Sequence, residues 1–183
     1  SQSKDDTSKI KNLYRLAVAF APSDSAKALQ YANTSMRISQ QIKWEKGIGL
    51  SYLAFGKAYY QITDYNAALS NCNTALSIFK KFNDKKNIAT ALGTIAVAFN
   101  GLGNYSKCIE NNYAALSLFE ELNDEKGIEN IYNNIGVAYY YLLDYDKAIA
   151  NYKKALPMCI KLDDKYGIAS ALDNIAIAYM DEG

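Results

Sequence analysis

The side chains that most often carry out acid–base or nucleophilic chemistry are absent or scattered in this sequence. The 183 residues contain no histidine, which removes the commonest general base and metal ligand. Each of Cys72, Cys108 and Cys159 lies beside apolar residues, and we interpret them as buried small hydrophobic residues, not as a disulfide framework. The sequence has no CxxC pair, glycine-rich phosphate loop or GxSxG turn. We therefore expect no catalytic residues, no metal site and no cofactor.

Composition and charge narrow the classes of partner. Half of the residues are hydrophobic, which indicates a folded domain with its own core. The 20 lysines and arginines nearly balance the 19 aspartates and glutamates, and the two signs are interspersed, so no basic patch points to nucleic acid. The apolar runs are too short to span a bilayer. We expect no nucleic acid and no membrane insertion. The compartment stays open: it is cytoplasmic or, if a signal peptide was removed, periplasmic.

A 40-residue repeat organises most of the chain. Isoleucine recurs at positions 48, 88, 128 and 168, alanine at 58, 98, 138 and 178, and tyrosine at 65, 105 and 145. Residues 85–124 and 125–164 share 14 identical positions in 40 without a gap. We predict a single domain over residues 1–183, with repeats at about 5–42, 43–84, 85–124 and 125–164, followed by a lone first helix at 165–180.

Each repeat is predicted to be a pair of antiparallel helices, because its apolar residues are spaced three and four apart and its connections are only a few residues long. Aspartate or asparagine at positions 64, 104, 124, 144 and 164 can cap the helices that follow. Small residues such as Gly56 and Ala68 let paired helices approach closely. We expect Trp44 to pack where the first two repeats meet, and Pro157 to bend its helix. The predicted helices lie at about 5–20, 24–42, 45–61, 65–82, 85–101, 105–122, 125–142, 145–162 and 165–180.

The stretch "GVAYYYLLDYDKAIANYKKAL", residues 136–156, closely resembles the tetratricopeptide repeat. The resemblance is clear from Lys43 to Glu182, and a degenerate first unit precedes it. The common form of this family repeats every 34 residues. The longer period here is similar to a subgroup found in bacterial peptide-sensing regulators, bacterial sensor proteins and animal spindle-orientation adaptors. The resemblance implies an all-α, right-handed superhelix of antiparallel helix pairs, with a concave groove lined by the first helix of each pair.

In the resembling family, ligands contact first-helix positions that lie beside the packed stripe. Asparagine amides there can bond both the N–H and the C=O groups of an extended peptide, and tyrosines add rigid contact area. The resemblance therefore implies a groove that binds a protein or an extended peptide. The corresponding residues are Leu50, Leu53, Lys57, Tyr60, Thr90, Gly93, Val97, Asn100, Asn130, Asn133, Asn134, Val137, Tyr141, Asp173, Asn174 and Ile177.

Other interpretations of these positions stay open. Asn133 and Asn134 also fit a solvated helix face, and Tyr141 also fits packing between repeats. Lys57 is the only cation in the set, which disfavours a clamp for a C-terminal carboxylate, and we interpret it as a solvated lysine. The charged residues at 84–86 and 124–126 are interpreted as turn and capping residues.

Two classes of function are compared. The resemblance favours a protein-interaction module, either the sensory part of a larger bacterial signalling protein or a free-standing adaptor. The other class is an enzyme on a helical-repeat scaffold, for which no set of reactive residues is placed.

The last helix lacks a partner in this pattern. Its apolar face, with Ile168, Leu172 and Tyr179, predicts a homodimer through residues 165–180 as an assembly alternative. We also expect flanking segments to lie outside this sequence.

Overall fold

The computed structural model describes residues 2–183, with side chains from Asp5 onward, and in this part of the chain every regular element is a helix. The predicted helix bounds are confirmed to within three residues, and α2 to α8 have 17 residues each. The helices are α1 Gln2–Phe20, α2 Ser25–Gln41, α3 Glu45–Gln61, α4 Tyr65–Lys81, α5 Lys85–Gly101, α6 Tyr105–Glu121, α7 Glu125–Tyr141, α8 Tyr145–Lys161 and α9 Lys165–Glu182.

From α2 onward, each turn uses one residue both to end a helix and to begin the next. After α3, the Asp64 N–H donates to the Tyr59 carbonyl at 3.0 Å and the Thr63 N–H donates to the Tyr60 carbonyl at 3.0 Å, which is a Schellman motif. The Asp64 carboxylate then accepts from the Ala67 N–H and caps α4. The side-chain caps predicted at positions 64, 104, 124, 144 and 164 are confirmed. Three residues therefore suffice to reverse the chain.

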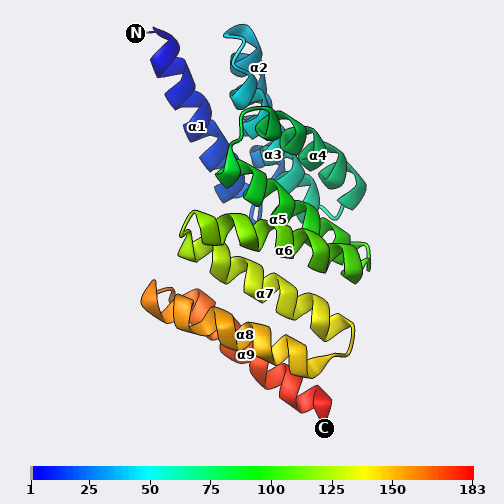
Figure 1. The fold of residues 1–183 in the computed structure, drawn as a ribbon. Coiled ribbons are helices and arrows are strands. Elements are labelled where there is room, and N and C mark those ends of the chain that lie inside the picture. Colours follow the sequence, from blue (N-terminus) through cyan, green and yellow to red (C-terminus); the bar gives the residue numbers. More distant parts are fainter. Residues whose placement is uncertain (1) are drawn as a thin grey trace.

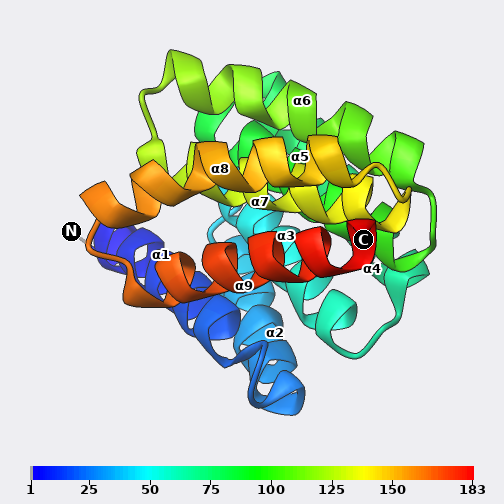
Figure 2. The same ribbon diagram turned by 90° about the horizontal axis from the view of Figure 1, so that it is seen from below.

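The helices stack in chain order from α1 to α9 (Figure 1). Each helix packs against its neighbour in sequence, and the first helices also meet one another, as α1 with α3, α3 with α5 and α5 with α7. Seen from below, α3, α5 and α7 lie toward the middle, and α2, α4 and α6 lie toward the outside (Figure 2). The predicted fold class, an all-α superhelix of antiparallel helix pairs, is confirmed.

Small residues bring the paired helices together, as predicted. A Cβ atom added to Gly56 would lie 2.2 Å from the Cys72 sulfur and 3.3 Å from the Ala68 carbonyl oxygen, so α3 and α4 can pack this closely only with glycine there. All three cysteines are free and buried, as expected. Trp44 packs against both the cluster that contains Ile10 and the cluster of the next repeat, which confirms its predicted place.

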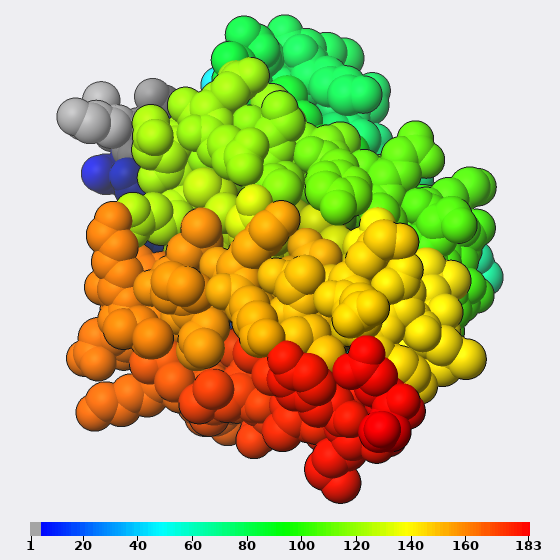
Figure 3. All heavy atoms as spheres, turned by 60° about the horizontal axis from the view of Figure 1, so that its bottom comes forward, coloured from blue at the N-terminus to red at the C-terminus, as the bar shows by residue number. Residues whose placement is uncertain are grey.

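The C-terminal helix is covered on one side only. Ala171 and Ala178 are buried, whereas Leu172 and Tyr179 are half-exposed and Met180 is 79% exposed. Figure 3 shows this end of the molecule, with α9 in red below α8 in yellow to orange. The homodimer through this helix stays a prediction. α8 continues through Pro157 as a single helix, and the bend expected there also stays a prediction.

Candidate peptide-binding groove

A groove of about 600 Å³ opens on the inner face of the first helices. α1 and its following turn provide one wall, α3 and α5 the middle, and α7 the other wall. The groove is polar at several points and apolar between them. The lining residues are Val18, Ala21, Pro22, Lys57, Tyr60, Gln61, Lys86, Ala89, Thr90, Gly93, Thr94, Val97, Phe119, Asp124, Lys126, Gly127, Asn130, Ile131 and Asn134.

The structure brings together part of the predicted site. Seven of the predicted residues line this groove, namely Lys57, Tyr60, Thr90, Gly93, Val97, Asn130 and Asn134. They come from α3, α5 and α7, so residues up to 77 positions apart in sequence share one surface. The remaining predicted residues lie elsewhere.

Leu53 was predicted to contact a ligand, and this expectation does not fit its position. Its side chain is fully buried in the cluster that includes Cys72 and Phe79, and Leu50 is 7% exposed in the same cluster. The cause is tertiary packing: although Leu53 lies one helical turn before Lys57, it belongs to one buried cluster with residues of α4 and α5. The family pattern predicted the helix but not the burial of this position.

Other predicted positions form a second polar region, near α9. The Asn174 amide donates to the Asn133 side-chain oxygen at 3.1 Å and so links α9 to α7, while Asp173 is exposed. Tyr141 is 53% exposed, and its ring is stacked on Tyr105 with the ring centres 5.5 Å apart. Both interpretations given to Tyr141 therefore have a structural basis, because one face of the ring packs between repeats and the rest is accessible.

Asn100 lies at the C-terminal end of α5, outside the groove lining. Its side-chain oxygen is buried and has no hydrogen-bond partner among the described residues. Such an atom usually has a partner in folded proteins.

Lys57 differs from the solvated lysine that the sequence suggested. It is half-buried in the groove wall, and no carboxylate of the described residues forms an ion pair with it. Burial lowers the pKa of its ammonium group. The nearby Cys72 thiol supplies no counter-charge at neutral pH, because burial raises its pKa to about 12.

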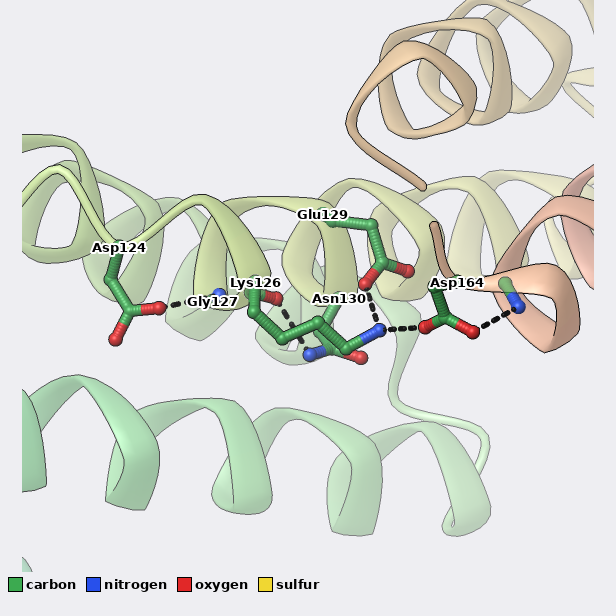
Figure 4. Close-up of polar contacts among 7 residues, drawn as sticks. Asp124, Lys126, Gly127, Glu129, Asn130 and Asp164 are labelled. Carbon is green, nitrogen blue, oxygen red and sulfur yellow. Dashed lines mark hydrogen bonds and ion pairs between the residues drawn. The ribbon is translucent and has the colours of Figure 1, made fainter. Parts of the chain in front are cut away.

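The other lysines of the groove are paired. Lys86 Nζ lies 2.8 Å from the Asp124 carboxylate, and Lys126 bridges Glu129 and Asp164. Figure 4 shows the Lys126 ammonium between these two carboxylates. Sequence analysis assigned residues 84–86 and 124–126 to turns and caps. Asp84 and Asp124 do cap helices, but Lys86, Asp124 and Lys126 also form ion pairs between successive repeats and line the groove.

The Lys126 network has defined electrostatics. Burial disfavours the Lys126 ammonium, but its hydrogen bonds to Asp164 and Glu129 outweigh this effect and raise its pKa. The hydrogen bond from Lys126, together with that from the Gly167 N–H, lowers the pKa of Asp164. Lys126 and Asp164 are therefore charged at neutral pH, and Lys126 is held between the carboxylates of Asp164 and Glu129.

Sequence reasoning missed the wall made by α1 and its turn. Val18, Ala21 and Pro22 belong to the first repeat, which departs from the repeat pattern, so no matching position marked them. Within the described residues, no three His, Cys, Asp or Glu side chains gather as a metal site would require. No described helix combines the length and apolar character needed to cross a membrane.

The chain was compared with known sequences and solved structures. A family model described as tetratricopeptide repeat matches residues 87–161 and 127–182. No curated protein sequence gives a match. Among solved structures, aspartyl phosphate phosphatase F from Bacillus subtilis superposes with a TM-score of 0.80 at 17% identity, over 93% of this chain and 45% of that one.

Two other solved structures share the architecture. A signal transduction ATPase with numerous domains and a tetratricopeptide repeat sensor, from Pyrococcus horikoshii, gives a TM-score of 0.76 at 21% identity, over 96% of this chain and 28% of that one. A Rap protein in complex with competence and sporulation factor gives a TM-score of 0.79 at 17% identity, over 95% of this chain and 53% of that one. This chain thus spans about half or less of the length of these proteins. At such identities the likeness shows the fold.

The family matches together cover residues 87–182, which is more than half of the chain, and they coincide with the repeated helix pairs and turns described above. This protein therefore belongs to the tetratricopeptide repeat family.

Proposed function

We propose that this chain is a protein-interaction module that binds an extended peptide segment of a partner in the groove between α1 and α7. The observation that carries the proposal is the lining itself: polar side chains from three successive first helices face one open groove of about 600 Å³. A surface that presents separated hydrogen-bonding groups along its length suits the regularly spaced N–H and C=O groups of an extended chain. No catalytic role is part of this proposal.

The asparagines of α7 are the groups best placed to bond a peptide backbone. The Asn130 amide nitrogen donates to the Lys126 carbonyl at 2.7 Å, which leaves its side-chain oxygen free to accept. Asn134 lines the groove, and none of the described hydrogen bonds involves its side chain. Asn133, by contrast, is bonded to Asn174. The pair to test is therefore Asn130 and Asn134.

The experiment begins with a random library of ten-residue peptides, acetylated and amidated so that no terminal charges remain. At about 3.3 Å per residue such peptides can cross the inner face of several helices. Peptides retained by the chain are identified, and their Kd values are measured by fluorescence anisotropy. Asn130→Ala combined with Asn134→Ala should weaken binding severalfold and leave the melting temperature nearly unchanged, because Asn130 is exposed, Asn134 is only partly buried, and surface substitutions usually change the free energy of unfolding by about 0.5 kcal/mol or less.

Asn111→Ala is the matched control. Asn111 makes the same bond to the carbonyl four residues earlier, at 2.8 Å, but it lies on the second helix α6, outside the groove. Binding by this variant should equal that of the unchanged chain. Retention of no peptide, or equal loss in both variants, would contradict the proposal.

A finer proposal concerns the protein around this module. The sensor in the Pyrococcus horikoshii ATPase is a tetratricopeptide repeat, which favours a sensory role within a larger signalling protein over a free-standing adaptor. The mass and membrane fractionation of the native protein, detected with an antibody against residues 1–183, distinguish the two. A product several times larger than 20.3 kDa supports the sensor, and a product of similar mass supports the adaptor.

A further inference from the structure

We infer that the groove selects partner segments with an acidic residue at one position, whose side-chain carboxylate pairs with the ammonium group of Lys57. This inference rests on the proposed function, because it names the chemistry of the segment that the groove holds. Three observations support it: the place of Lys57 in the repeat, its missing counter-ion and the path of the groove on either side of it.

Lys57 occupies a position that is apolar in the other repeats. The residues 40, 80 and 120 positions later are Val97, Val137 and Ile177. Val97 lines the same groove, so the wall accepts an aliphatic side chain at this position without change to the fold. Fold formation therefore does not require a cation here. An ammonium group in a half-buried wall carries a desolvation cost that valine avoids.

The charges that line the groove do not cancel. Three lysines, Lys57, Lys86 and Lys126, face a single lining carboxylate, Asp124. Asp124 already accepts from Lys86 and from the Gly127 N–H, and Lys126 is held by Glu129 and Asp164. Lys57 alone among the three has no ion-pair partner in the described structure. The lining therefore presents one uncompensated positive charge.

A carboxylate at Lys57 would gain more than one at a surface lysine. Exposed ion pairs contribute little because water already solvates both charges. Lys57 is half-buried, which lowers the pKa of its ammonium, so a carboxylate beside it restores the favourable interaction with the charge that burial removed. A charge-assisted hydrogen bond in such a place is about twice as strong as a neutral one.

The groove continues past Lys57 in both directions. Val18, Ala21 and Pro22 lie on the α1 side, while Thr94 and Val97 lie on the α5 side, followed by Asn130 and Asn134 of α7. A chain that terminated at Lys57 would leave one part of the groove empty. An acidic residue inside a continuous segment can pair with Lys57 while the rest of the segment fills the groove on both sides. We therefore assign the carboxylate to an Asp or Glu side chain.

The test uses two forms of the random ten-residue library, one with C-terminal amides and one with free C-terminal carboxylates. The unchanged chain should enrich Asp or Glu at one position of the amidated peptides. Lys57→Val should lose this enrichment and bind the selected acidic peptide about tenfold more weakly, while Lys57→Arg should keep most of the binding. Replacement of the acidic residue in the peptide by its amide should weaken binding to the unchanged chain by a similar factor and leave binding to Lys57→Val unaltered.

The control variant is Lys80→Val, an exposed lysine on α4 outside the groove, which should bind as the unchanged chain does. The melting temperature of Lys57→Val should equal or exceed that of the unchanged chain, because an unpaired half-buried charge is removed, and this excludes misfolding as the cause of weaker binding.

Each remaining outcome decides against the inference. Retained peptides without acidic preference, or with a preference that Lys57→Val keeps, would overturn it and leave the proposed function standing. Enrichment only among free-acid peptides would assign Lys57 to a chain terminus. Retention of no peptide from either library would overturn the proposed function as well.

Discussion

Two adjacent repeats, α5 with α6 and α7 with α8, solve the same packing problem in different ways. In the first, Ala89 and the ring of Phe119 belong to one buried apolar cluster. In the second, the corresponding residues are Glu129 and Cys159. Glu129 is 5% exposed, contacts the Cys159 thiol and binds Lys126. A large and a small residue have exchanged helices, and a charged network takes the place of an aromatic ring.

The comparison shows that the two repeats share the backbone and a large–small pairing of side chains at this contact, while the polarity of those side chains differs. A phenylalanine on the second helix demands a small residue on the first, and a cysteine there leaves room for a glutamate. The lysine three residues earlier, Lys126, reaches the buried glutamate and pairs with its carboxylate. The same helix-pair backbone thus surrounds an apolar cluster in one repeat and an ion-pair network beside the groove in the next.

The largest effect is expected from moving the glutamate into the wrong repeat. Ala89 is fully buried, so Ala89→Glu places a carboxylate where Phe119 already fills the space. We expect a loss of about 3 kcal/mol or more in the free energy of unfolding, measured by urea denaturation. The double variant Ala89→Glu with Phe119→Cys should recover more than half of this loss, because Lys86 corresponds to Lys126. A loss of less than about 1 kcal/mol in the free energy of unfolding of Ala89→Glu would contradict the comparison.

A smaller effect is expected from removing the lysine of each repeat. Lys126→Met leaves the Glu129 side chain, which is 7% exposed, without a cation, and should cost about 2 kcal/mol. Lys86→Met removes only the more exposed pair with Asp124 and should cost about 0.5 kcal/mol. Thermal and urea unfolding of the two variants measure the difference. Equal losses would mean that the burial of Glu129 does not matter.

A third effect, smaller than that of Lys126→Met, concerns the turn between the two helices of each repeat. Gly103 has φ 72°, and the corresponding Leu143 has φ 61° with its side chain 71% exposed. A left-handed conformation is easy for glycine and costly for other residues. Leu143→Gly should raise the free energy of unfolding by about 0.5–1 kcal/mol, and Gly103→Leu should lower it by about 1 kcal/mol. A rise in the melting temperature of Leu143→Gly together with a fall in that of Gly103→Leu would support the comparison. Changes in the same direction would contradict it.

The sequence predicted the helices, their caps and the tight packing at Gly56 because these depend on local spacing that the 40-residue pattern repeats. It failed where the outcome depends on contacts between repeats. Leu53 follows the family pattern, but it is buried in a cluster that includes Ile88 and Ile95 of the next repeat. Lys126 meets Asp164 across 38 residues, a contact that no local pattern specifies. The α1 wall was missed because the first repeat lacks the markers of the others.

The shared turn residues also determine how such a chain can change in length. Because the Asp or Asn residue that follows one helix also caps the next at positions 64, 84, 104, 124, 144 and 164, a block of 40 residues cut at one of these positions contains a complete set of helix ends. Duplication or deletion of one block therefore adds or removes a helix pair and leaves two well-formed boundaries. Insertion of such a block lengthens the groove by one helix pair and leaves every cap next to its helix.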